Sequence, residues 1–159
     1  MNQFTESHLK TWKEDYLKLI NSSKYSLSED NVWMLGDKFG ILCIFDEEEI
    51  AYISYCKSIY KTLKEIININ KNNELINLIL IHGIGISEKN PKTKTLSNVN
   101  IKKIKKIVSK FKYSLITIES NYIEKVAQAF IVVSDPIYNG HTSHLNKILD
   151  NLPIKKENL

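Results

Sequence analysis

The chain has 159 residues and a net charge of +4, and it is 43% hydrophobic and 25% charged, as in ordinary globular domains. No segment approaches the roughly 18 uninterrupted apolar residues of a membrane helix, and no apolar signal core opens the chain, so we expect a cytoplasmic protein without a membrane span. All 22 basic residues are lysine. Because lysine lacks the planar fork that reads guanine and phosphate, no specific nucleic-acid partner is expected.

The first half of the chain predicts a helix, a hairpin and a second helix. Apolar residues recur at helical spacing over residues 5–20, which indicates an amphipathic helix. NVWML and FGILCIF, over 31–45, are strand-like runs separated by a glycine-containing turn, as in a β-hairpin. Asp46 and Glu49 have the spacing of a capping box, so a long helix is expected from there to Ile67.

The second half alternates strands with helices. The run LINLILI is continuously apolar, which is typical of a strand covered on both faces. Ser97 or Asn98 can cap the helix that follows. The expected elements are a strand over 75–81, a helix over 99–111, a strand over 113–118, a helix over 122–133, a short strand over 136–138 and a helix over 144–152.

Leaving aside the first helix, the predicted order is β-β-α-β-α-β-α-β-α. Such alternation favours an α/β fold with a mixed, mostly parallel sheet and the hairpin at one edge. We expect residues 1–30 to form an N-terminal amphipathic helix and linker, 31–152 a single α/β domain, and 153–159 a C-terminal tail.

Over residues 31–152 this order resembles that of the STAS domain family of bacterial anti-sigma-factor antagonists, and more loosely that of STAS-like proteins related to the SEC14 fold. The similarity rests on LINLILIHGIGIS as central strand and exit loop, ITIESNYIEKVAQAFIVVS as strand then helix, and YNGHTSHLNKILDNL as closing unit. The resemblance implies a non-catalytic regulatory role. It also implies phosphorylation at the start of the helix after the central strand, where Ser97 lies nearest, with Thr95 and Ser87 before it. The alternative is that Ser97 only caps the helix.

The string HGIGIS holds the second candidate site. It lacks the GxSxG elbow of lipase-like hydrolases, the GK[ST] of a P-loop and the full GxGxxG of a dinucleotide fold. Gly83 and Gly85 can simply turn the backbone out of the sheet beside His82. Alternatively, His82, Gly83 and Gly85 border a pocket or partner loop, since ligands of α/β sheets bind beyond the carboxyl ends of strands.

A stripe of lysines follows the predicted helix over 99–111. Lys102, Lys103, Lys105 and Lys106 alternate with isoleucines. Such a helix can contact an anionic surface, or it can pack its apolar stripe on the sheet while the lysines stay solvated.

No cofactor or metal is expected. His141 and His144 lie three residues apart near Asp135 and Asp150, but no third ligand accompanies them. Cys43 and Cys56 have no CxxC spacing, which indicates reduced core thiols.

These observations favour a non-catalytic regulatory or protein-interaction module with a protein partner, since no nucleophile, base and orienting group can be placed together. The alternative is an immunity-type protein that neutralises a toxin by surface contact, and a small-molecule or lipid carrier is less supported. The apolar face of the N-terminal helix can cover the sheet or a second subunit, so a homo-oligomer is possible there.

Overall fold

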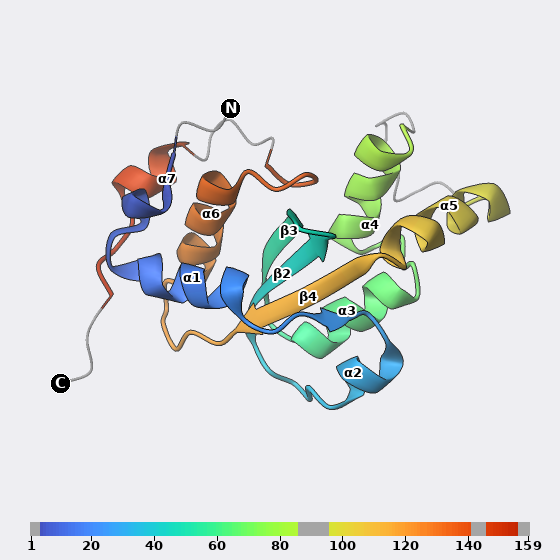
Figure 1. The fold of residues 1–159 in the computed structure, drawn as a ribbon, viewed down its shortest axis with the longest axis horizontal. Coiled ribbons are helices and arrows are strands. Elements are labelled where there is room, and N and C mark those ends of the chain that lie inside the picture. Colours follow the sequence, from blue (N-terminus) through green and yellow to red (C-terminus); the bar gives the residue numbers. More distant parts are fainter. Residues whose placement is uncertain (1–3, 86–95, 141–145, 156–159) are drawn as a thin grey trace.

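A computed structural model gives the fold and describes residues 4–85, 96–140 and 146–155 (Figure 1). The helices are η1 (Glu6–Trp12, 3-10), α1 (Lys13–Asn21), α2 (Glu29–Trp33), α3 (Ile59–Ile67), α4 (Glu74–Leu78), η2 (Ile79–Gly83, π), α5 (Asn98–Val108), α6 (Ile123–Ser134) and α7 (Asn146–Asp150). The strands are β1 (Tyr25–Ser26), β2 (Gly40–Asp46), β3 (Glu49–Cys56) and β4 (Phe111–Ile116).

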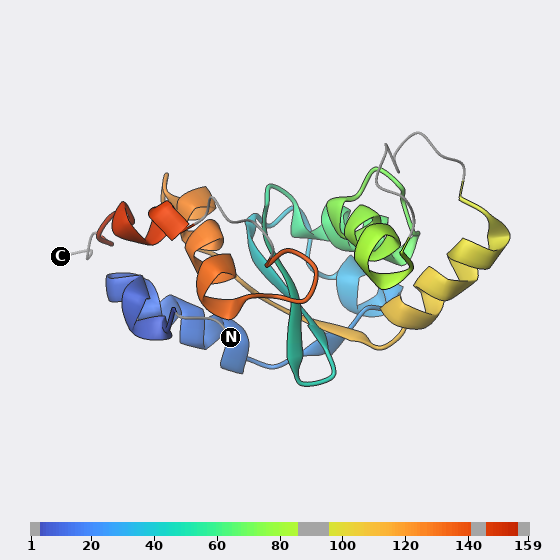
Figure 2. The ribbon, with the colours of Figure 1, turned by 90° about the horizontal axis from the view of Figure 1, so that it is seen from above.

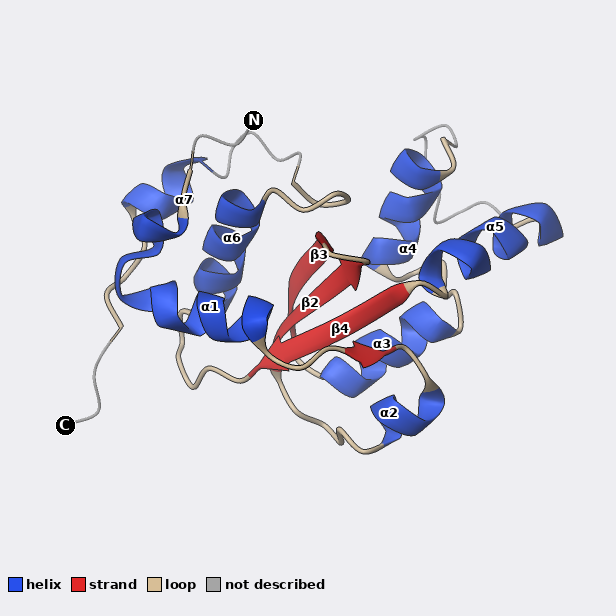
Figure 3. Cartoon of the chain, viewed as in Figure 1, coloured by secondary structure: helices blue, strands red, loops and turns tan. Residues whose placement is uncertain are grey.

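The strands form one sheet in the order β1-β4-β2-β3 (Figure 3). Every pairing in the described residues is antiparallel. The mixture of helices and strands is therefore confirmed, but the expectation of a mostly parallel sheet is wrong. The reason is local: β2 and β3 are joined by a two-residue turn, and a connection that short can join only antiparallel strands.

Helices cover both faces of the sheet, as Figure 2 shows from above. The central strand β2 is buried on both sides. Its residues Ile41, Cys43 and Phe45 enter a core with η1, α1, α6 and α7. Leu42 and Ile44 enter a second core with α2, α3, α4, η2 and α5. Alternate residues of a strand point to opposite faces, so one strand links the two cores.

The N-terminal helix of the prediction is present, broken into η1 and α1. Its helical stripe Leu9, Trp12, Tyr16 and Leu19 is buried in the first core. The break lies at Lys10, where φ is 54° and ψ is −123°. The apolar face that could have met a second subunit is thus used within the chain.

Residues 31–45 do not form the predicted hairpin. Ser28 caps α2 instead, because its Oγ accepts a hydrogen bond from the backbone N of Asn31 at 3.3 Å. The hairpin lies one element later, between β2 and β3, with Glu47 at a φ of 56° in its turn. The capping-box interpretation of Asp46 and Glu49 is therefore wrong, because these two residues face each other across the hairpin.

Residues 75–81 are helical, contrary to the predicted strand. Asn73 caps α4 by accepting a hydrogen bond from the backbone N of Ile76 at 3.2 Å. The buried side chains of α4 and η2 are Leu75, Ile76, Asn77, Ile79 and Leu80. Their spacing of one, three and four residues places them on one side of a helix, so the segment covers the sheet instead of joining it.

The remaining predicted helices are confirmed as α5, α6 and α7, and the strand over 113–118 as β4. Residues 136–138 are not a strand, but they follow the outer edge of β3. The backbone N of Ile137 donates to the carbonyl of Ile50 at 3.1 Å, and that of Tyr138 donates to the carbonyl of Ala51 at 3.0 Å.

Asn139 continues this edge contact with its side chain. Its Nδ2 donates to the carbonyl of Ile53 at 2.6 Å, and its Oδ1 accepts from the backbone N of the same residue at 3.4 Å. One side-chain amide therefore replaces the peptide group of a neighbouring strand.

In the part of the chain that the structure describes, no helix is long and apolar enough to cross a bilayer.

Candidate functional site

The predicted HGIGIS loop begins at the end of η2. A Cβ added at Gly83 would lie 3.3 Å from Cγ2 of Ile79, a tight contact within η2 itself, and 3.5 Å from Cδ1 of Ile107 of α5, an ordinary van der Waals distance. Gly85 has a φ of +81° and no atom within 4 Å of an added Cβ, so it serves the backbone alone. His82 is exposed beside them. These two glycines therefore have structural explanations, and a pocket at this loop stays a prediction.

The candidate phosphorylation sites are described only in part. Ser97 is the N-cap of α5, because its Oγ accepts a hydrogen bond from the backbone N of Asn100 at 3.1 Å. Ser87 and Thr95 lie outside the described residues. Phosphorylation of any of the three stays a prediction.

The lysines of α5 form one exposed face of the helix. The members of this lysine face are Lys102, Lys103, Lys105 and Lys106, all exposed. They lie opposite Ile104 and Val108, which enter the core. Among the residues that the structure describes, no carboxylate forms an ion pair with them. The face has the charge of an anionic contact, and such a contact stays a prediction.

The thiols of the chain are buried and protonated at neutral pH. Cys43 and Cys56 are free and buried, and desolvation raises the pKa of Cys56 to about 11 and that of Cys43 further. Protonated thiols are poor nucleophiles. His141 and His144 lie outside the described residues, within which no group of three metal-ligating side chains occurs.

A polar pocket of about 520 Å³ lies where the N-terminal helices, the loop after β4 and the C-terminal tail meet. Its lining residues include Trp12, Asp15, Glu119, Tyr122 and Lys155. Lys155 Nζ lies 3.0 Å from Asp15 Oδ2, and Trp12 Nε1 donates to the carbonyl of Pro153 at 2.6 Å. These two contacts hold the C-terminal tail against the N-terminal helices. The pocket wall therefore has a structural explanation.

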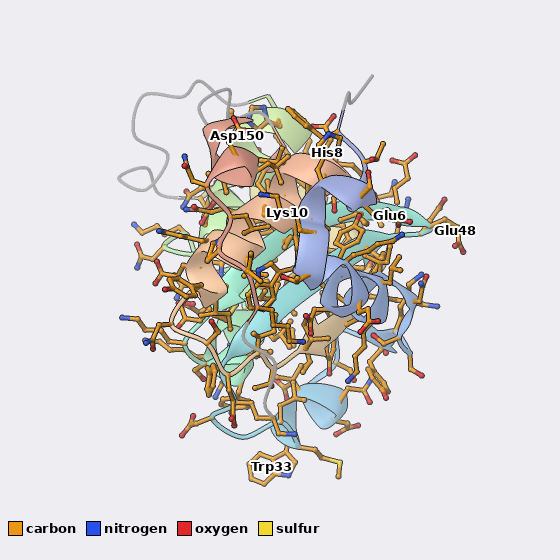
Figure 4. The ribbon with its side chains drawn as sticks, turned by 90° about the vertical axis from the view of Figure 1, so that its left-hand side faces the viewer. Glu6, His8, Lys10, Trp33, Glu48 and Asp150 are labelled. Atoms are coloured by element: carbon orange, nitrogen blue, oxygen red, sulfur yellow. The ribbon has the colours of Figure 1, made fainter. Side chains whose placement is uncertain are left out.

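Among the residues that the structure describes, the most exposed large apolar side chains lie at the end of α2, where the sequence had predicted a strand. Trp33 is 76% exposed and Met34 is 82% exposed. Figure 4 shows Trp33 at the extremity of the molecule with its indole in solvent. Val32, the preceding residue, is buried. One short helix thus inserts one residue into the core and presents the next two to solvent.

Two hollows flank these side chains. The larger, of about 510 Å³, is lined by Ser22, Ser23, Tyr25, Asn31, Met34, Leu35, Tyr113 and Leu115. The smaller, of about 220 Å³, is lined by Glu29, Val32, Trp33, Tyr60, Lys64 and Ile67. We call Tyr25, Trp33, Met34 and the two hollows the α2 surface.

Hydrogen bonds hold α2 in place on the sheet. Asn31 Nδ2 donates to the carbonyl and to the Oγ of Ser26, both at 3.1 Å, which ties the helix to β1. Tyr113 Oη donates to the carbonyl of Asn31 at 3.3 Å, which ties the same helix to β4. The α2 surface is therefore presented by an anchored element.

Comparisons with protein-family models, with curated proteins and with solved structures found no match. The resemblance to STAS-like proteins stays a prediction.

Proposed function

We propose that this protein is a non-catalytic interaction module that binds a protein partner through the α2 surface. The observation that carries the proposal is the exposure of Trp33 and Met34, side by side on an anchored helix. Full burial of a large apolar side chain yields about 1.5–3 kcal/mol, which neither residue gains within the chain. A complex in which a partner covers both side chains gains this free energy on binding.

The kind of residue also supports a protein partner. Tryptophan is among the residues most enriched at the energetic centres of protein interfaces, and methionine adapts to irregular partner surfaces. The exposed Trp33 can insert into a partner, and side chains of the partner can insert into the two hollows beside it. Because Asn31 and Tyr113 fix α2, little ordering entropy opposes binding.

A toxin-neutralising protein remains the alternative function. Such a protein would also use an exposed apolar surface, so the α2 surface does not distinguish a regulatory module from a toxin-neutralising protein. The identity of the bound protein distinguishes them: a bound regulator supports the regulatory module, and a bound toxin supports the toxin-neutralising protein.

The test is quantitative co-purification from the cells that naturally make the protein. Wild type is compared with the double variant Trp33→Ala/Met34→Ala and with Ile154→Ala. The control is matched because Ile154 is 70% exposed and follows α7, which Figure 1 shows on the other side of the molecule from α2. Loss of an interface centre costs 2 kcal/mol or more, so we expect binding to fall at least about 30-fold in the double variant alone. A partner retained equally by all three proteins would remove the α2 surface from the proposal.

A further inference from the structure

Resting on the proposed function of the α2 surface, we infer that its occupant is a second copy of this chain. The two copies form a two-fold homodimer in which the Trp33 and Met34 ridge of each enters a hollow of the other. From the sequence, the apolar face of the N-terminal helix could cover either the sheet or a second subunit. That face is buried within the chain, as Trp12 and Leu19 show, so it offers no surface to a second copy.

The first argument is the shape of the surface. In a two-fold interface the same patch occurs twice, so a patch must be complementary to itself. Trp33 lines the smaller hollow and Met34 the larger, which places the ridge between two recesses. Rotation by half a turn brings the ridge of one copy over a recess of the other. A patch that is convex throughout lacks this property.

The second argument is the chemistry of the recesses. The larger hollow is lined by the apolar or aromatic side chains of Tyr25, Met34, Leu35, Tyr113 and Leu115, beside two serines and one asparagine. An indole or thioether fits such a lining, because it buries carbon surface while the polar groups stay at the side. The occupant that the recess favours is thus the kind of side chain that the ridge presents.

Charge is the third argument. The smaller hollow holds one carboxylate, Glu29, and one ammonium group, Lys64. In a two-fold dimer, Glu29 of one copy can approach Lys64 of the other, and the reciprocal pair forms at the same time. The +4 charge of each chain opposes association in general, but this surface contributes one charge of each sign.

The area sets the expected strength. Large side chains such as aromatics bury about 150–250 Å² each when fully covered. Tyr25, Trp33 and Met34 are 52%, 76% and 82% exposed, so at about 200 Å² each they still supply about 420 Å² per copy. Two copies then bury about 840 Å² of these side chains, just below the roughly 1,000 Å² of a specific interface. We therefore expect a reversible dimer that dissociates on dilution, not a permanent one.

Sedimentation velocity over a roughly thousand-fold range of concentration tests the inference on the purified full chain. The expected result is a monomer–dimer equilibrium that Trp33→Ala weakens at least about 100-fold, since each substitution acts twice in a two-fold dimer. Ile154→Ala should leave the equilibrium unchanged. Circular dichroism checks that Trp33→Ala is folded, as expected for a side chain that is 76% exposed.

Two further readouts report the position of the interface directly. Acrylamide quenching reports Trp33, because Trp12 is 1% exposed, and it should fall as the protein concentration rises. Mild oxidation of Met34→Cys should yield a covalent dimer, whereas Ile154→Cys should not. The native Cys43 and Cys56 do not interfere, because both are buried.

A protein that stays monomeric at every concentration overturns the inference, and so does a dimer that Trp33→Ala leaves intact. If the protein is monomeric and the double variant still loses a different protein in the co-purification, the inference fails and the proposed function stands. If the protein is monomeric and the double variant loses nothing, both fail.

Discussion

The two tryptophans of the chain lie on opposite sides of the sheet and have opposite surroundings. Trp12 is 1% exposed in the core beside η1, α1, α6 and α7, and its Nε1 donates to the carbonyl of Pro153. Trp33 is 76% exposed on α2, on the other side of the sheet.

The difference extends to the helices around them. On the Trp12 side, polar groups pair within the chain: Tyr16 Oη lies 2.8 Å from Ser134 Oγ, and Ser114 Oγ donates to the carbonyl of Leu19 at 2.6 Å. On the Trp33 side, α2 and α5 present Trp33, Met34 and the lysine face to solvent. Both sides pair polar groups within the chain, but the Trp33 side also presents its two most exposed apolar side chains next to each other.

The largest effect separates the two tryptophans by stability. Trp12→Ala should reduce the free energy of unfolding by about 3–5 kcal/mol, because it leaves a cavity in the core. Trp33→Ala should change it by less than about 0.5 kcal/mol, as for exposed positions in general. Urea denaturation at low protein concentration measures both. Equal losses would mean that Trp33 is part of the core.

Substitution of Gly40 tests the strand that both cores share. An added Cβ at Gly40 would collide with the carbonyl oxygen of Ile116, a backbone atom of β4 that cannot rotate away. We expect Gly40→Ala to cost about 3 kcal/mol, the upper part of the range for overpacking.

Gly36→Ala is the comparison for Gly40→Ala. No atom lies within 4 Å of its added Cβ, and only its φ of +59° opposes the change, so about 1 kcal/mol is expected. Equal effects in urea denaturation would show that close packing of β2 and β4 is not the cause.

Removal of the Asn139 amide tests the outer edge of β3. Asn139→Ala leaves the N–H and the carbonyl of the buried Ile53 without their side-chain partner, so a loss of about 1–3 kcal/mol is expected. Hydrogen exchange at the amide of Ile53 should accelerate. Asn121→Ala, at an exposed loop position, should change neither quantity. Unchanged protection of Ile53 would contradict the assigned role.

The buried cysteines give an effect that is confined to alkaline pH and absent at neutral pH. Burial raises the pKa of Cys56 from 9.0 to about 11, so the folded state keeps the proton that the unfolded chain releases. Stability from this thiol is complete below pH 9 and is lost as the pH rises toward 11, by at most about 1.4 kcal/mol per pH unit. Iodoacetamide should leave Cys56 unmodified in the folded protein at neutral pH. Rapid modification there would contradict its burial.

The sequence predicted elements with a clear period and failed where several structures share one pattern. The helices α5 and α6 were expected because their apolar residues recur at helical spacing. The run LINLILI is apolar at nearly every position, which suits a strand buried on two faces equally well as a helix packed in a core. The cap at Asn73 was the signal that decides for the helix.

The error at Asp46 has a different cause. Asp46 and Glu49 do match a capping box, but the alternating β-branched and aromatic residues of EIAYISY favour a strand, and pairing with β2 decided the outcome. Glu47 accepts a positive φ that glycine or asparagine usually supplies. A local sequence pattern does not contain the information on which strand a segment will pair with in the folded protein.

The α2 surface could not be predicted, because each of the four apolar residues of NVWML is a core candidate when the sequence is taken alone. Val32 is buried while Trp33 and Met34 are not, and the choice depends on where α3 and β4 lie. The lysines of α5 are easier to predict: they were expected to stay solvated if the isoleucines between them pack inward, and all four are exposed while Ile104 is buried.

The contact that Ile137, Tyr138 and Asn139 make along β3 also decides how copies of this chain can meet. An open strand edge is a template on which another chain can add a strand, and repeated addition leads to fibrils. Here Ile50, Ala51 and Ile53 already bond to a segment of their own chain. Strand addition is blocked along this stretch, so a second copy that meets the molecule at this edge can contact it only through side chains.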